Sequence, residues 1–494
     1  MPVTVWIPLL VPARAQPGGD RTGTSWLTGG MTATTDAPTT MAAATVATLR
    51  ATYRSGVTRP LAWRRRQLGQ LARMLQENEA AFLDALKVDL GKPPVEGYIT
   101  DIAFVLSEIE DMVKHLARWN RTTRVSSPLV TLPARSKLVP EPLGVVLVIA
   151  PWNYPVQLLL APVAGAIAAG NTVVMKPSEV SAATSALLAR LVPRYMDPSA
   201  IALVEGGVPE TTALLAERFD HIFYTGNGTV GRVVMAAAAR HLTPVTLELG
   251  GKSPVIVDRS ANLRVAARRV AWGKWLNAGQ TCIAPDYVLV HEDVRDRFLD
   301  ELTEAVTTFY GADPHASADY GRIVSDRHFD RLAALAQDGT VVVGGRTEAS
   351  ERYIAPTVLV DVDPSSPVMQ EEIFGPLLPV LTVASARQAV DMVNERDHPL
   401  ALYVFAGDKA VVDDVLARTT SGGVTVNGTM LHFTNPHLPF GGIGESGMGG
   451  YHGESGVRLF QHLKPVLTRG TAVDPSLPYP PYNDRKAKIF RKIL

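Results

Sequence analysis

The sequence predicts an α/β protein built from two doubly wound units. Between residues 143 and 251, short runs of valine, leucine and isoleucine alternate with segments of helical periodicity, and a second α/β alternation follows over residues 252–424. A run that is apolar at nearly every position, such as 144–150, is typical of a strand buried on both faces of a parallel sheet. Strands that alternate with helices along the chain join such a sheet through crossover connections.

The elements follow in order from their patterns. Helices are expected over 45–90 and 98–120, where apolar residues recur at helical spacing. Residues 121–142 hold short apolar pieces separated by prolines and predict an exposed hairpin arm. The first unit has expected strands at 144–150, 172–176, 201–205, 221–225 and 245–249, with helices over 156–169, 181–191, 210–216 and 229–241. The second has expected strands at 255–257, 287–291 and 400–405 and a helix over 263–276, and residues 425–460 are glycine-rich and irregular.

Composition excludes several classes of protein. Of 494 residues, 46% are hydrophobic and 19% are charged, which is ordinary for a globular protein. Lys plus Arg equals Asp plus Glu, 48 each, and this balance argues against a nucleic-acid partner, which requires a basic excess. The sequence has no uninterrupted apolar run of about 18 residues, so we expect no transmembrane segment. A single cysteine is typical of a reducing compartment, and we expect a cytoplasmic location.

The N-terminal residues differ from the rest of the chain. Residues 1–41 are rich in Thr, Ala, Pro and Gly without helical periodicity, and we expect a disordered extension there. The apolar run at 3–11 lacks a preceding basic region and contains Pro8, which argues against a secretory signal. Met31 and Met41 are alternative starts, so the sequence leaves open whether 1–40 belong to the mature protein.

Cys282 is the only cysteine of the chain. A lone thiol excludes an internal disulfide and speaks against a metal site, so no metal is expected. Two interpretations remain, a small buried hydrophobe or a nucleophile. The neighbouring Gly279, Gln280 and Thr281 are small or polar. They favour a nucleophile that substrate can reach.

Four polar or glycine residues fall at the carboxyl ends of expected strands, where parallel sheets bind ligands: Asn153, Lys176, Gly226 and Glu248. Glu248 follows an apolar strand, and burial at such a position raises a carboxyl pKa, which suits a general base. The Asn153 amide could stabilise an oxyanion together with the backbone N–H of Cys282. The alternatives are a structural carboxylate and an asparagine that satisfies its own loop.

A glycine pattern suggests a dinucleotide. Gly226, Gly228 and Gly231 form a Gly-x-Gly-x-x-Gly sequence between an expected strand and helix, although a tight turn explains it equally. Lys176 and Glu179 lie where a lysine and a carboxylate can hold ribose hydroxyls, and a surface ion pair is the alternative.

Four segments together resemble the signature segments of the aldehyde dehydrogenase superfamily, in the same order. They are 150–155 (Ala-Pro-Trp-Asn-Tyr-Pro), 246–254 (Thr-Leu-Glu-Leu-Gly-Gly-Lys-Ser-Pro), 279–285 around Cys282, and 370–376 (Gln-Glu-Glu-Ile-Phe-Gly-Pro). The resemblance covers residues from about 42 to 490. Segments 223–227, 438–442 and 447–453 most resemble the class 3 and fatty-aldehyde branch.

This resemblance implies a division into domains. Residues 42–120 and 143–251 would form the NAD-binding Rossmann-like domain, and 252–424 the catalytic domain with the cysteine. Residues 121–142 and 425–465 would form a small β element that makes a homodimer, and 466–494 a C-terminal tail.

The resemblance also assigns cofactor contacts. Lys176 and Glu179 would hold the adenosine ribose and Glu372 the nicotinamide ribose, with Phe374 beside the ring. Gly250 would let the backbone approach the nicotinamide, and Gly226 and Gly231 would belong to the helix start that faces the cofactor. The Glu179 carboxylate would repel a 2′-phosphate, which favours NAD, with NADP still possible.

The implied reaction is oxidation of an aldehyde to a carboxylic acid. Cys282 would attack the aldehyde to give a thiohemiacetal, loss of hydride would leave a thioester, and Glu248 would activate the hydrolytic water. The branch implies medium- to long-chain aliphatic or aromatic aldehydes, and Trp272 and Trp275 could line an apolar tunnel. Rival interpretations are a cysteine-dependent hydrolase, disfavoured by the α/β alternation, and a catalytically silent relative, disfavoured by the presence of both Cys282 and Glu248.

Two further features complete the sequence. His432, His437 and His452 lack the spacing of a ligand set, so we expect structural or substrate-lining roles. Near the C-terminus, Asn483 and Asp484 predict a helix cap, followed by a basic helix with apolar residues on one side. Such a helix could make weak peripheral contact with a membrane, or it could dock on its own protein or a partner subunit.

Overall fold

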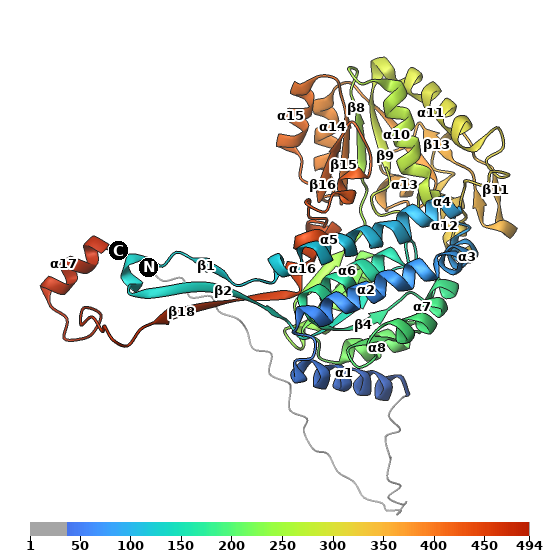
Figure 1. Cartoon of the computed structure of the whole chain (residues 1–494). Helices are drawn as coiled ribbons and strands as arrows, with labels where there is room; N and C mark the ends of the chain where they lie inside the picture. Colours follow the sequence, from blue (N-terminus) through green and yellow to red (C-terminus); the bar gives the residue numbers. More distant parts are fainter. Residues whose placement is uncertain (1–36, 494) are drawn as a thin grey trace, which may run out of the picture. The chain divides into compact units, whose positions relative to one another are not determined.

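Two parallel sheets organise the chain in this computed structural model, which describes residues 37–493 (Figure 1). The first sheet has the strand order β17-β7-β6-β3-β4-β5 and the second β10-β13-β14-β9-β8-β15-β16. Each is parallel except at one edge, where β17 and β10 run antiparallel to their neighbours. The expected fold class, two doubly wound α/β units with a small β element, is confirmed.

The first sheet contains the strands predicted from continuous apolar runs, and β3 and β4 are buried at every position. Its strands are β3 (Val145–Ile149), β4 (Thr172–Lys176), β5 (Ile201–Leu203), β6 (His221–Thr225), β7 (Val245–Glu248) and β17 (Gly447–Met448). Its helices are α6 (Gln157–Ala169), α7 (Ala182–Tyr195), α8 (Val208–Ala216) and α9 (Gly228–Ala239). Helix α6 is apolar after its first residue, Gln157, and wholly buried, as expected for a helix at the centre of a core.

The second sheet is likewise built from short strands that alternate with helices along the chain. Its strands are β8 (Pro254–Val257), β9 (Tyr287–His291), β10 (Thr340–Val343), β13 (Thr357–Val360), β14 (Leu377–Val383), β15 (Ala401–Phe405) and β16 (Gly423–Val426). Its main helices are α10 (Leu263–Trp275), α11 (Arg295–Tyr310), α12 (Asp326–Leu335), α14 (Ala386–Asn394) and α15 (Lys409–Arg418). Short elements between them are β11 (Thr347–Glu348), β12 (Tyr353–Ile354) and α13 (Pro367–Gln370).

Helices precede the first sheet, as the periodicity predicted. They are α1 (Ala37–Ser55), α2 (Leu61–Glu77), α3 (Glu79–Leu90), α4 (Pro94–Gly97), the π-helix Tyr98–Ala103 and α5 (Phe104–Trp119). Helices α2 and α5 pack on α6. Helix α1 begins within the segment 1–41 that we expected to be disordered, and it buries Ala42, Val46 and Leu49. Residues 37–41 are therefore helical, and the expected boundary at 41 is wrong by these five residues. Residues 1–36 lie outside the described part.

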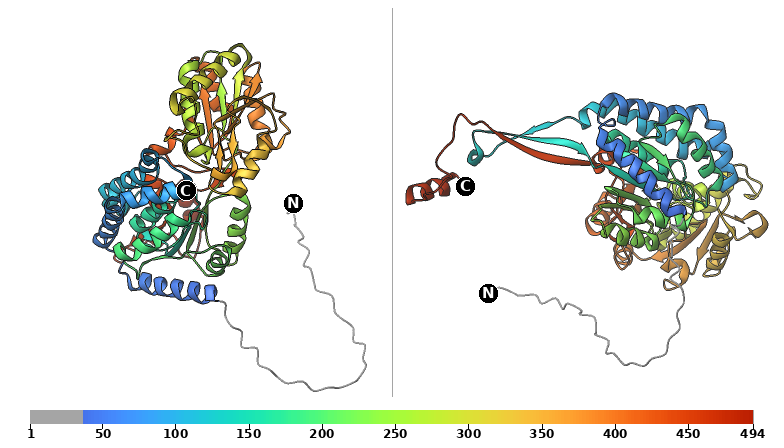
Figure 2. Two further views of the ribbon diagram at one scale, coloured as in Figure 1. Left: turned by 90° about the vertical axis from the view of Figure 1, so that its right-hand side faces the viewer. Right: turned by 90° about the horizontal axis from the view of Figure 1, so that it is seen from below.

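A three-stranded antiparallel sheet forms the arm. Strands β1 (Thr123–Val125) and β2 (Ala134–Pro142) are joined by β18 (Gln461–Arg469), which pairs with β2 along its whole length (Figure 2). Strand β18 therefore passes the expected boundary at 465. Most of 425–460 does not enter the arm, because β17 pairs with β7 and α16 (Gly453–Leu459) packs on α5 and α6. The tail ends in α17 (Asp484–Ile493).

No helix within residues 37–493 has the length and apolar character needed to cross a membrane.

Candidate active site

The segment that carries Cys282 is folded back sharply after α10. Asn277 and Ala278 adopt left-handed backbone angles, with φ of 52° and 51°, and Gly279 follows with φ of 75°. A Cβ at Gly279 would lie 2.2 Å from the carbonyl oxygen of Gly375, so glycine is required there. Left-handed angles are costly for Ala278, and such strain persists only where surrounding contacts impose it.

Those contacts come from the side-chain amides of Asn277 and Gln280, for which the sequence alone indicated no such role. Asn277 Nδ2 donates to the carbonyls of Asn153 (2.9 Å) and Gln280 (3.2 Å). Gln280 Nε2 donates to the carbonyls of Asn277 and Arg322, and its Oε1 accepts the Val324 N–H at 2.9 Å. Both side chains are buried, and these hydrogen bonds all go to backbone groups, while Asn277 Oδ1 has no partner among the described residues. The signal for them is the uncommon polar content of an otherwise buried segment.

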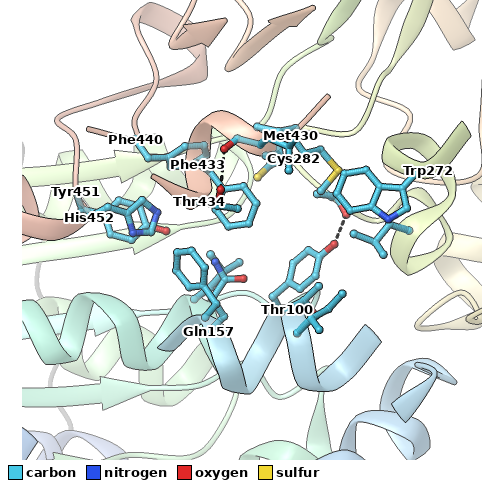
Figure 3. Close-up of a pocket in the computed structure, with 18 residues that line it drawn as sticks. Thr100, Gln157, Trp272, Cys282, Met430, Phe433, Thr434, Phe440, Tyr451 and His452 are labelled. Carbon is cyan, nitrogen blue, oxygen red and sulfur yellow. Dashed lines mark hydrogen bonds between the residues drawn. The ribbon is translucent and has the colours of Figure 1, made fainter. Parts of the chain in front are cut away.

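Cys282 lies in the wall of an apolar cavity of about 230 Å³ (Figure 3). Trp272 stands at one side of the sulfur, and Tyr451 and His452 stand at the other. The π-helix, α6, α10 and the segment 430–440 supply most of the lining, which includes Ile99, Thr100, Phe104, Leu158, Met430, Phe433 and Phe440.

The residues that line the cavity test the expectations for the tryptophans and histidines. Trp272 lines it, whereas Trp275 is buried elsewhere and donates from Nε1 to the Pro376 carbonyl at 2.9 Å. His452 is among the lining residues, while His432 and His437 are not. In the described part of the chain, no group of three or more His, Cys, Asp or Glu residues could hold a metal ion.

Burial and two carboxylates control the Cys282 thiol. Burial raises its pKa, and the charges of Glu372 and Glu248 raise it further, while the backbone N–H groups of Cys282 and Ile283 act in the opposite direction. The resting group is therefore a thiol. A base must take its proton before the sulfur can act as a nucleophile.

Glu248 is the last residue of β7 and is 3% exposed. Neither carboxylate oxygen has a hydrogen-bond partner among the described residues. Burial raises the pKa of this carboxyl well above its usual range. A buried, unpaired carboxyl that gains stability by accepting a proton suits the expected general base.

Asn153 follows β3 and is 2% exposed. Its Nδ2 donates to the Gln280 carbonyl at 3.0 Å, and its Oδ1 has no partner among the described residues. The side chain is therefore fixed beside the Cys282 segment rather than turned into its own loop. One N–H of the amide is engaged by Gln280, which leaves the other able to serve the expected role of oxyanion donor.

The residues expected to hold the adenosine ribose lie at the carboxyl edge of the first sheet. Lys176 ends β4, is 2% exposed and donates from Nζ to the Pro177 carbonyl at 2.7 Å. Its Nζ is 3.8 Å from Glu179 Oε2, and that carboxylate is half exposed. Asn227 caps α9 by accepting the Val230 N–H at 3.0 Å. Lys176 thus ends β4, and α9 begins after β6, and these two strands lie on either side of β3 in the sheet.

The glycines of this region serve the protein's own packing. A Cβ at Gly226 would lie 2.2 Å from the Tyr224 hydroxyl, and one at Gly231 would lie 3.0 Å from Leu249 Cδ2. Gly231 therefore lets α9 approach β7 closely, which is one role of the third glycine in dinucleotide-binding turns. Internal packing alone accounts for the glycine at 226.

Glu372 and Phe374 complete the site from the second unit. A Cβ at Gly250 would lie 1.8 Å from Glu372 Oε2, so this glycine admits the carboxylate. Glu372 Oε1 is buried without a partner among the described residues, and burial raises the pKa of Glu372 to about 8. The Phe374 ring packs edge-on against Trp152 at 5.3 Å between centroids. An unpartnered carboxylate oxygen here fits a ribose hydroxyl, so the residues present fit a bound dinucleotide.

Comparison with known proteins decides the family. The model of the aldehyde dehydrogenase family matches residues 27–466. The chain belongs to this family. A rat protein named "Aldehyde dehydrogenase, dimeric NADP-preferring" is 51% identical over 425 residues, covering 86% of this chain and 94% of the relative. Mouse "Aldehyde dehydrogenase family 3 member A2" is 48% identical, covering 90% of this chain and 92% of the relative.

A solved structure agrees. "Substrate bound state of Staphylococcus Aureus AldH" matches with a TM-score of 0.90 and 42% identity, covering 92% of this chain and 99% of that one. The expected class 3 branch is confirmed, and the protein is an NAD(P)-dependent aldehyde dehydrogenase. The interpretation as a cysteine-dependent hydrolase falls with this result.

Proposed function

We propose that the enzyme oxidises medium- to long-chain aliphatic or aromatic aldehydes, with Cys282 as nucleophile, Glu248 as general base and Asn153 as an oxyanion donor. One observation supports this most directly: the only thiol of the chain lies in the wall of an apolar cavity with two buried carboxylates near it. The division into cofactor-binding and catalytic domains, 42–120 with 143–251 and then 252–424, is part of this proposal.

The first step is attack by Cys282. A nearby carboxylate takes the thiol proton, and the sulfur forms a bond to the aldehyde carbon. The carbonyl oxygen becomes an oxyanion, which the Cys282 backbone N–H and the free N–H of Asn153 stabilise. Loss of one such donor costs about 2.7–4 kcal/mol of barrier in other enzymes.

The cofactor supplies the hydride acceptor when it is bound. Lys176 and Glu179 would hold its adenosine ribose and Glu372 its nicotinamide ribose, with Gly250 and Phe374 beside the ring. Loss of hydride leaves an acyl thioester on Cys282. Glu248 then takes a proton from water, the oxygen adds to the thioester carbonyl, and the carbon–sulfur bond breaks to release the carboxylic acid.

For the choice of cofactor, we propose that both NAD and NADP are used and that NAD is favoured. The half-exposed Glu179 carboxylate would repel a 2′-phosphate, whereas Lys176 is nearly buried and held by the Pro177 carbonyl. The rat relative carries the name NADP-preferring, which supports retained use of NADP.

Aldehyde length should set the specificity constant. Each methylene buried in the cavity contributes about 0.8 kcal/mol, so kcat/KM is expected to rise roughly fourfold per added methylene until the cavity is full. Formation of reduced nicotinamide is measured with straight-chain alkanals, benzaldehyde and a semialdehyde carrying a carboxylate, with each cofactor in turn. A preference for the charged semialdehyde would contradict the proposed substrate class.

A homodimer is proposed from exposed apolar surface. On β18, Leu463 and Leu467 are 40% and 50% exposed, and on α9 Val233 is 56% exposed. Strand β18 also forms one edge of the arm sheet, and an unpaired edge is a template for pairing with another chain. The word "dimeric" in the rat relative's name supports this assembly.

A cytoplasmic location is proposed because the thiol must stay reduced.

The tail is proposed to touch anionic membrane surfaces weakly through α17. The expected cap is present, since Asn483 Oδ1 accepts the Lys486 N–H at 3.0 Å. The helix is basic, with Arg485, Lys488 and Arg491 exposed, and Ile489 is exposed as well. Basic charge with an apolar residue on one short helix is typical of weak, salt-sensitive membrane contact.

Cosedimentation with anionic vesicles tests the tail. The full chain should sediment more than a chain ending at Pro478, and high salt should remove the difference because it screens the basic residues. Neutral vesicles serve as the control. Equal sedimentation of the two forms would contradict membrane contact, and a smaller mass of the shortened form in light scattering would instead assign α17 to the dimer.

A further inference from the structure

A buried ion pair lies behind the Cys282 segment. Lys92 Nζ is 2.8 Å from Asp101 Oδ2, and both side chains are fully buried. Lys92 follows α3, and Asp101 lies in the π-helix Tyr98–Ala103. A buried pair is weak evidence for stability, because desolvation of the two charges offsets their attraction. Such a pair is better explained by the geometry that it imposes on its neighbours.

The pair holds the turn between β3 and α6. Lys92 Nζ donates to the Asn153 carbonyl at 3.2 Å and lies 4.1 Å from the centre of the Tyr154 ring. Asp101 Oδ1 accepts the N–H groups of Val156 (3.2 Å) and Gln157 (3.3 Å). Lys92 thus holds the middle of this turn, and Asp101 holds its end at the start of α6.

The turn between β3 and α6 also holds the segment that carries Cys282. Asn153 Nδ2 donates to the Gln280 carbonyl, and the Tyr154 hydroxyl is 2.6 Å from Thr281 Oγ1. Gln280 and Thr281 directly precede Cys282. The Asn153 carbonyl receives a second donor from Asn277 Nδ2 at 2.9 Å, so two donors define the orientation of its peptide plane. That orientation sets where the Asn153 amide points.

The π-helix links this pair to the substrate cavity. Its residues Ile99 and Thr100 line the cavity, while Asp101 of the same turn points into the ion pair. Single π-helical turns are rare and occur frequently at functional sites, because the wider turn redirects side chains. Here Ile99 and Thr100 line the substrate cavity, whereas the next residue, Asp101, pairs with Lys92.

We propose that Lys92, fixed by Asp101, is a positioning residue that aims the Asn153 amide at the oxyanion formed on Cys282. This inference rests on the oxyanion role proposed for Asn153. Lys92 touches neither the substrate cavity nor Cys282, and it acts through the carbonyl of Asn153. Its loss should therefore lower kcat with little change in KM for the aldehyde.

The test uses the full-length enzyme with Lys92→Met and Asp101→Asn combined. Removing both charges avoids leaving one buried charge unpaired, and the asparagine oxygen can still accept the N–H groups of Val156 and Gln157. The matched control is Arg64→Met. Arg64 is another buried cation that donates to backbone carbonyls, those of Thr58, Arg59 and Ala168, but it makes no contact with the Asn153 turn.

The expected result is a loss of kcat on the order of tenfold to a hundredfold in the paired variant, with KM for the aldehyde within a few-fold. In an Asn153→Ala background, which should itself lose about 10²–10³ in kcat, the paired variant should add almost nothing, because both changes remove the same interaction. Arg64→Met should keep kcat and lower only the melting temperature. Alkylation of Cys282 by iodoacetamide should proceed at the same rate in all forms that retain Asn153.

Two outcomes overturn the inference alone: unchanged kcat in the paired variant, or a loss that multiplies fully with that of Asn153→Ala. Unchanged kcat in Asn153→Ala would instead remove the oxyanion role of Asn153, and the inference with it. If the paired variant does not fold, Lys92→Arg provides the test, since it keeps a positive charge opposite Asp101 but moves the donor that holds the Asn153 carbonyl. A smaller loss that is absent in the Asn153→Ala background supports positioning, and no loss contradicts it.

Discussion

Cys282→Ala should abolish formation of reduced nicotinamide, with a loss on the order of 10⁴-fold or more, as seen when a covalent nucleophile is removed from other enzymes. Binding of NAD should stay within a few-fold of the unchanged enzyme, because the residues at the carboxyl edge of the first sheet are untouched. Turnover is followed by absorbance of the reduced cofactor, and binding by the quenching of tryptophan fluorescence.

The control for this change is Cys282→Ser, which keeps nearly the same volume with a far weaker nucleophile. It should be almost as inactive as the alanine variant, with an unchanged melting temperature. Substantial turnover by Cys282→Ala would remove this residue from the mechanism. Because the chain has one cysteine, a single iodoacetamide adduct in the mass spectrum of the unchanged enzyme accounts for any loss of activity on alkylation.

The sign of the pH dependence follows from the same environment. Burial and the charges of Glu372 and Glu248 raise the pKa of the thiol, so its reactive thiolate is scarce at neutral pH. Alkylation of Cys282 should therefore accelerate as pH rises above neutrality. An alkylation rate that is constant across this range would show that another interaction stabilises the thiolate.

Much of this site follows from the sequence because local rules place it. Largely apolar runs define β3, β4 and β7, and the residues that end or follow such strands lie at the ligand-binding edge of the sheet. Asn153, Lys176 and Glu248 are found there. A strand end or a lone thiol can be recognised from a few consecutive residues, so the sequence alone reveals it.

The remaining features depend on contacts between distant segments. Glu372 approaches Gly250 across more than one hundred positions, and Lys92 reaches the Asn153 carbonyl from a helix end. Buried polar networks have no periodicity, and each member is recognisable only when its partner is in place. The left-handed Asn277 and Ala278 are equally hidden, since neither residue type demands that backbone.

Glu248→Gln should separate the two halves of the reaction. The amide cannot take a proton from water, so hydrolysis of the thioester slows by about 10²–10⁴, the usual contribution of a general base. Loss of hydride needs no proton from this residue and should persist. Rapid mixing should then show a burst of reduced cofactor close to one equivalent per active site, followed by a slow steady state.

The substitution should leave the fold intact. Glutamine has nearly the same volume as glutamate and brings no charge into this buried position. The melting temperature should therefore change little. Glu372→Gln is the matched control, because Glu372 is the other carboxylate near Cys282. It should weaken cofactor binding and raise KM for NAD, without producing a burst.

The rate of the burst also shows which group accepts the proton of the Cys282 thiol. If Glu372 or solvent accepts that proton, the burst in Glu248→Gln keeps its rate, whereas a slower burst of full amplitude would show that Glu248 serves in both halves. Loss of the burst together with turnover would contradict a role confined to deacylation. Glu248 would then act before hydride leaves, which its position near Cys282, with both oxygens unpaired among the described residues, also permits.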